Sequence, residues 1–116
     1  MQLMKETFGQ ILKELRRSKN ISQRELADKV RVDFSYISKV ENDRLAPPSA
    51  ETIIKISNIL DIPSEVLLSH SGKLSDEMKD TMSSSPEALM FMNAAKDMNL
   101  QAEEWQQLIG ELKKLR

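Results

Sequence analysis

Apolar residues in the first 68 positions recur every three or four residues, and short polar or proline-containing stretches separate the recurring runs. This spacing is typical of helices that turn one face toward a core. The last four runs are each preceded by a residue that favours a helix start, either a side chain that can cap the helix or a proline. The pattern therefore predicts five helices, which begin at Thr7, Ser22, Asp33, Ser49 and Pro63.

The second and third predicted helices are short and close together in the sequence. Ser22 and Glu25 have the spacing of a capping box, which predicts the start of the second helix. The third helix is predicted from Asp33 to about Asn42, so residues 30–32 are all that can lie between the two helices. A linker this short makes two brief helices cross steeply, which is the helix-turn-helix arrangement.

The rest of the chain also has helical spacing, after a stretch around Gly72 (69–75) that is typical of a linker. Three further helices are predicted, over residues 76–82, 86–98 and 101–115. We therefore expect an all-α protein with a five-helix, helix-turn-helix domain over residues 1–70 and a helical C-terminal extension over residues 71–116.

Charge is distributed unevenly along the chain, although the net charge is only −1. Residues 1–48 carry 10 Lys and Arg against 7 Asp and Glu, a charge of +3, whereas residues 49–116 carry 7 against 11, a charge of −4. A polyanion would be attracted to the first part and repelled by the second. The distribution is a weak indication of nucleic-acid binding and does not decide the question alone.

Several function classes find little support in the composition. The absence of cysteine excludes disulfides and cysteine-ligated zinc. Residues 1–20 are too charged for a signal peptide, and no apolar run is long enough to cross a membrane, so we expect a cytoplasmic protein. His70 is the only histidine, and the serines at 83–85 have no indicated base partner. We therefore expect no metal site, no cofactor and no enzymatic activity.

The sequence from Ser22 to Asn42 closely resembles the core of the Cro and phage-repressor (Xre-type) regulators, and the resemblance extends over residues 8–68. It rests on residues at fixed offsets along this stretch: Gln23, Leu26, Ala27, Val32, Ile37, Ser38 and Glu41. Arg31 stands where the family usually has a glycine in a left-handed turn, at a cost of about 1 kcal/mol of strain. The resemblance implies a sequence-specific DNA-binding regulator of transcription.

In the fold that the resemblance implies, the N-terminal part of the third helix enters the major groove of DNA. Residues that point away from the inward-facing Ile37 and Val40 are the candidates for base contacts: Asp33, Phe34, Ser35, Ser38 and Lys39. A lysine at position 39 suits guanine. Phe34 suits a thymine methyl group, with a gap-filling place in the core as the alternative.

The resemblance also implies residues that hold the DNA backbone without reading its sequence. The phosphate-binding candidates are Ser22, Gln23, Tyr36, Asn42 and Arg44. The alternatives are a packing role for Tyr36 and a solvated surface charge for Arg44. Arg16 and Glu41 match a structural ion pair between the first and third helices, and loss of one partner would strand a desolvated charge at a cost of about 3 kcal/mol.

The C-terminal extension is rich in methionine, which suits an adaptable interface as well as a core. The candidate interface residues are Met90, Trp105, Leu108, Ile109 and Leu112. Because one small domain covers only half of an operator, we expect a homodimeric repressor on double-stranded DNA, with its two third helices about 34 Å apart on a palindromic site. The extension is also similar to tails found in toxin–antitoxin regulators. The alternative is therefore an antitoxin or adaptor whose tail binds a partner protein while the first domain regulates its own promoter.

Overall fold

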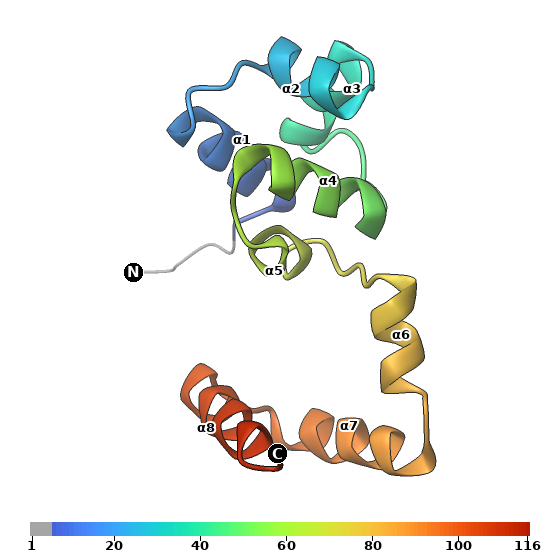
Figure 1. The fold of residues 1–116 in the computed structure, drawn as a ribbon. Coiled ribbons are helices and arrows are strands. Elements are labelled where there is room, and N and C mark those ends of the chain that lie inside the picture. The colour runs from blue at the N-terminus through green and yellow to red at the C-terminus, as the bar shows by residue number, and fades with distance from the viewer. Residues whose placement is uncertain (1–5) are drawn as a thin grey trace. The chain divides into compact units, whose positions relative to one another are not determined.

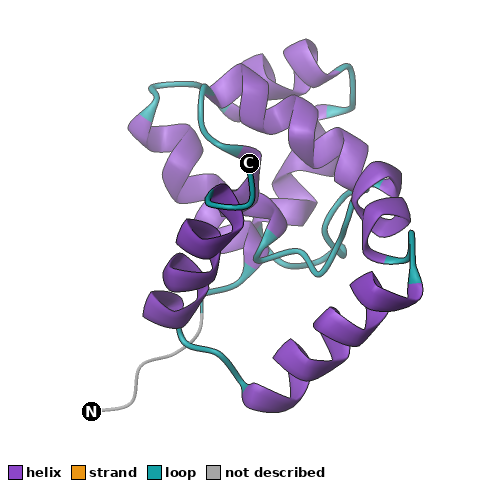
Figure 2. Ribbon diagram, turned by 60° about the horizontal axis from the view of Figure 1, so that its bottom comes forward, coloured by secondary structure: helices purple, strands orange, loops and turns teal. Residues whose placement is uncertain are grey.

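The computed structural model describes residues 6–116, so residues 1–5 of the predicted first domain lie outside the described part. Within residues 6–116 the chain forms eight helices and no strand (Figure 1; Figure 2). The helices are α1 (Phe8–Ser18), α2 (Gln23–Val30), α3 (Phe34–Glu41), α4 (Ala50–Leu60), α5 (Ser64–Leu68), α6 (Asp76–Met82), α7 (Pro86–Met98) and α8 (Ala102–Lys113). They form two compact units that divide between Ser75 and Asp76. The predicted all-α fold, with five helices followed by a helical extension, is confirmed.

The predicted starts of the first five helices are confirmed to within a residue, and three of these helices are capped by a hydroxyl side chain. Thr7, Ser22 and Ser49 each accept a hydrogen bond from a backbone N–H of the first turn, at 3.1, 3.0 and 3.3 Å. Asp33 has the extended backbone of a cap, but its side chain makes no capping hydrogen bond. Pro63 is the residue before α5 rather than its first residue.

One hydrophobic core joins α1 to α5, and it consists of the apolar positions that helical spacing turns to one side. Its buried members are Phe8, Leu12, Leu26, Ala27, Val30, Ile37, Val40, Ile53, Ile56, Leu60 and Leu67. Helix α1 approaches α3 closely at Gly9, where a Cβ atom would lie 2.7 Å from the Glu41 carbonyl oxygen and closer still to that of Val40. Glycine at position 9 thus permits the contact between these two helices.

The turn between α2 and α3 consists of Arg31, Val32 and Asp33. Arg31 has φ 68° and ψ 49°, which confirms the left-handed conformation that the resemblance implies. The backbone N–H groups of Arg31 and Val32 both donate to the Ala27 carbonyl oxygen, at 2.8 and 3.0 Å. These two bonds close the C-terminus of α2, so an arginine occupies the usual glycine position and the turn keeps its geometry.

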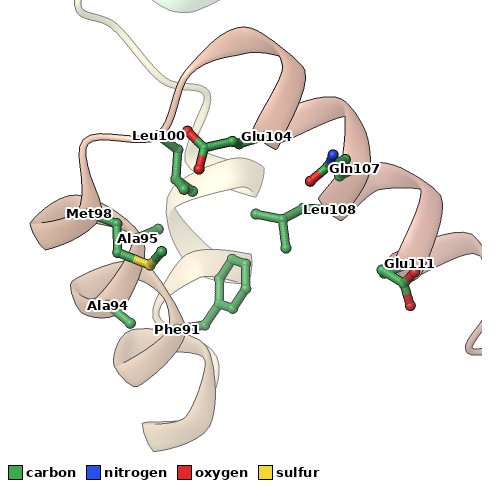
Figure 3. Close-up of a pocket in the computed structure, with 9 residues that line it drawn as sticks. All are labelled: Phe91, Ala94, Ala95, Met98, Leu100, Glu104, Gln107, Leu108 and Glu111. Carbon is green, nitrogen blue, oxygen red and sulfur yellow. The ribbon is translucent and has the colours of Figure 1, made fainter.

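The second unit contains α6, α7 and α8 and has very little core of its own. Within the described chain, Ala95 is its one buried hydrophobic residue. A groove of about 430 Å³ lies between α7 and α8, and Phe91 and Leu108 point into it from the two helices (Figure 3). No helix among residues 6–116 has both the length and the apolar character that crossing a membrane requires.

Candidate nucleic-acid interface

Helices α2 and α3 bury one face each and leave the other face to solvent. Leu26 and Val30 of α2 and Ile37 of α3 are at most 4% exposed. On the opposite side of α3 lie the residues predicted to read bases, of which Ser38 is half-buried and the others are exposed: Asp33, Phe34, Ser35, Ser38 and Lys39. Phe34 and Ser38 are four residues apart, as are Ser35 and Lys39, so the members of each pair lie on the same side of the helix. In helix-turn-helix proteins, exposed residues near the N-terminus of the recognition helix contact base edges in the major groove.

Phe34 packs against Arg24, a residue that the sequence did not single out. Its side chain is 39% exposed and lies outside the core cluster, so the gap-filling alternative was wrong. The Arg24 guanidinium carbon lies over the ring, 4.5 Å from its centre. The sequence did contain one signal for Arg24, because a positive charge in the first turn of a helix opposes the helix dipole.

A buried network of charged and polar groups joins α1, α2 and α3. Arg16 Nε lies 2.7 Å from Glu41 Oε2, and Arg16 Nη2 lies 2.9 Å from Glu41 Oε1, which makes the pair bidentate. Arg16 also donates to the Ile21 carbonyl oxygen at 2.8 Å. The Gln23 side-chain N–H donates to Glu41 Oε1 at 2.9 Å. Because Gln23 is the first residue of α2, the network fixes the start of that helix against α3.

The predicted phosphate-binding residues differ in how freely their polar atoms can reach a ligand. One of the two side-chain N–H donors of Gln23 is used by Glu41, which leaves the other for a partner. Asn42 uses its side-chain amide to donate to the Ser38 carbonyl oxygen at 2.9 Å, and Tyr36 packs against the core while half-buried. Arg44 is exposed, and the hydroxyl of Ser22 caps α2.

The predicted interface residues of the C-terminal unit lie on α7 and α8, and most of them are exposed. Met90 is 67% exposed and Leu112 is 64% exposed, which is high for apolar side chains. Trp105, Leu108 and Ile109 line a second apolar groove along α8. The second unit therefore has an apolar surface that nothing within it covers.

Metal binding has no structural support in the described chain. The His70 Nδ1 atom lies 3.0 Å from the Val66 carbonyl oxygen, on the surface. Within residues 6–116 no three or more His, Cys, Asp or Glu side chains are grouped so that they would hold a metal ion.

The family model described as helix-turn-helix matches residues 12–67 of this chain. The transcriptional regulator RghRB of Bacillus subtilis is 36% identical over 67 residues, which cover 58% of this chain and 48%, about half, of that relative. The transcriptional repressor RghR of Bacillus subtilis is 31% identical over 114 residues, which cover 91% of this chain and 82% of the relative. These relatives are named as regulators of transcription and not as enzymes.

Two solved structures of the regulator SinR are also similar. SinR in complex with DNA is 37% identical and has a TM-score of 0.50. The match covers 53% of this chain and 98% of the SinR chain. The SinR–SinI protein complex is 27% identical, has a TM-score of 0.51, and covers 92% of this chain and 95% of its own. Together with the α2–α3 geometry, these similarities establish that the chain belongs to the Cro and phage-repressor (Xre-type) family of DNA-binding helix-turn-helix transcriptional regulators.

Proposed function

We propose that this protein is a repressor that binds a palindromic operator as a homodimer, with α3 of each copy in the major groove. The observation that carries the proposal is the solvent-exposed side of α3, which presents Phe34, Ser35 and Lys39 next to the start of α2. The name of RghR as a repressor and the structure of SinR with DNA support it.

The residues at this interface divide into two roles. Lys39 and Ser35 contact base edges, and Phe34 contacts a thymine methyl group, so these three select the sequence. Gln23 and Arg44 contact phosphates, so they set the position of the protein on the duplex. The hydrogen bond from Gln23 to Glu41 supports this division, because it holds the glutamine beside α3 and leaves one amide N–H for a phosphate oxygen.

The apolar surface of α7 and α8 is the proposed dimer interface. A soluble protein rarely leaves a contiguous apolar face without a partner, and Met90, Ile109 and Leu112 are exposed on these two helices. Contact between identical faces gives two-fold symmetry, which is the symmetry of a palindromic operator. The −4 charge of residues 49–116 also disfavours contact between this part and phosphates.

Selection of bound sequences from random duplex DNA tests the proposal. The wild-type chain should enrich an inverted repeat whose half-sites are about 10 base pairs apart, centre to centre. Lys39→Ala should change the enriched base at one position of each half-site, whereas Gln23→Ala should enrich the same sequence with lower yield. Enrichment of a single unrepeated site, or of no sequence, would contradict the proposal.

A protein partner for the α7–α8 surface is the second candidate function. It is favoured by the exposed, methionine-rich face and by the similarity to SinR, which is seen in complex with the protein SinI. Light scattering on the purified full chain distinguishes the two candidates. A dimer at micromolar concentration supports the repressor homodimer. A stable monomer favours the second candidate, in which the α7–α8 surface binds a different protein.

A further inference from the structure

Arg24 and Phe34 stack on each other at the candidate interface. Arg24 lies in the first turn of α2, and Phe34 is the first residue of α3. The guanidinium carbon of Arg24 lies 4.5 Å from the centre of the Phe34 ring, and both side chains are exposed. The stack therefore adds a cation to the end of α3 that enters the major groove.

The surroundings of Arg24 leave its donors available. Among residues 6–116 no carboxylate lies within ion-pair distance of its guanidinium group. Arg24 lies in the first turn of α2, where its positive charge is repelled by the positive end of the helix dipole. The ring face of Phe34 attracts the same charge. A group held in this way keeps its five N–H donors free for an acceptor outside the protein.

We propose that Arg24 determines operator specificity by reading a guanine next to the base pair that Phe34 contacts; this inference rests on the proposed function. The planar guanidinium fork matches the O6 and N7 acceptors of guanine, and an apolar ring suits the methyl group of thymine. The guanidinium carbon lies 4.5 Å from the ring centre, a separation of the same order as the rise of about 3.4 Å between successive base pairs. The two stacked groups therefore read adjacent base pairs, one G·C and one T·A.

A base contact fits this geometry better than a phosphate contact. A phosphate contact positions the protein on the duplex and carries no sequence information, so it does not depend on where along the base pairs the guanidinium group lies. The contact with the Phe34 ring places the guanidinium group at the start of α3. This position is useful for reading a base edge.

The experiment begins with random-duplex selection by the full-length wild type, Arg24→Ala, Arg24→Lys and Phe34→Ala, with Arg17→Ala as control. Arg17 is exposed in the last turn of α1, so its loss removes the same charge away from the stack. Affinities are then measured on the wild-type operator and on two altered duplexes. In one duplex the guanine is replaced by 7-deazaguanine, which lacks N7. In the other the thymine is replaced by uracil, which lacks the methyl group.

We expect Arg24→Ala to lower affinity for the wild-type operator by roughly 5- to 150-fold and to abolish the preference for guanine at one position of each half-site. Arg24→Lys should restore only part of that preference, because its ammonium group lacks the planar fork that stacks on the ring, and Arg17→Ala should leave all preferences unchanged. The 7-deazaguanine duplex should weaken the wild type but not Arg24→Ala, and the uracil duplex should weaken the wild type but not Phe34→Ala. Thermal melting of each variant verifies that it is folded.

Two results would overturn the inference while leaving the proposed function intact. One is that Arg24→Ala weakens every duplex alike and Arg24→Lys recovers the loss, which is the behaviour of a phosphate contact. The other is that folded Arg24→Ala enriches the wild-type operator with unchanged preferences. If the wild type itself enriches no sequence, the proposed function and this inference fail together.

Discussion

Replacing Glu41 with alanine would leave the Arg16 guanidinium group buried without its carboxylate partner. In the wild type both guanidinium contacts to Glu41 are short, at 2.7 and 2.9 Å, and the two side chains are 8% and 0% exposed. Water therefore has little access to replace the carboxylate. The substitution also removes the acceptor of the Gln23 side chain, and Arg16 keeps only its 2.8 Å hydrogen bond to the Ile21 carbonyl oxygen.

The expected loss in the free energy of unfolding is about 3 to 5 kcal/mol, the usual effect of removing one member of a buried ion pair. Domains of this size have a total free energy of unfolding of roughly 5 to 15 kcal/mol, so the loss is a large part of it. Each kcal/mol corresponds to about 4 to 8 °C in the melting temperature of a domain of 60–100 residues. Glu41→Ala should therefore melt at least about 12 °C below the wild type.

Thermal unfolding of the full chain, followed by circular dichroism at one fixed protein concentration, measures this difference. The matched control is the double substitution Arg16→Met with Glu41→Leu, which removes both charges and fills the space with apolar atoms. Replacing a buried pair in this way is often close to neutral, so the double variant should recover most of the lost stability. A Glu41→Ala variant that melts within about 2 °C of the wild type but no longer binds DNA would refute the reasoning and place Glu41 at the interface instead.

Three further predictions test the interface, the packing and the C-terminal unit. Lys39→Ala should alter the preference for one base pair by about 1 to 3 kcal/mol, whereas Gln23→Ala should weaken all duplexes alike; anisotropy titrations with single-base-pair variants compare them, and an unchanged preference removes Lys39 from the reading face. Gly9→Ala should lower the free energy of unfolding by about 1 to 3 kcal/mol because its Cβ meets the α3 backbone. Gly110→Ala, whose Cβ meets nothing within 4 Å, should raise it by up to about 1 kcal/mol, and equal melting temperatures for these two variants would contradict the close α1–α3 approach. Truncation after Ser75 should convert a micromolar dimer into a folded monomer with weaker operator binding, and a truncated chain that still dimerises in light scattering rules out α7–α8 as the interface.

The sequence by itself determined the helices and most of their ends. The spacing of apolar residues predicts α7 over residues 86–98, and the structure has it over Pro86–Met98. Ser22 and Ser49 likewise mark the starts of α2 and α4. These features are readable because capping and helical periodicity involve residues only three or four positions apart, and the resemblance to a known family added the arrangement of α2 and α3.

Only the tertiary structure decided which polar side chains contact other residues of the protein and which remain available to a ligand. Gln23 donates a hydrogen bond to Glu41, 18 positions away, and Arg24 stacks on Phe34 across the turn. Neither contact follows from spacing within one helix, because each depends on how closely and at what angle α2 and α3 pack. The same holds for the exposed face of α7 and α8. Apolar periodicity predicts which side of each helix is apolar, but how the helices pack determines how much of it is buried. In the second unit little more than Ala95 is buried.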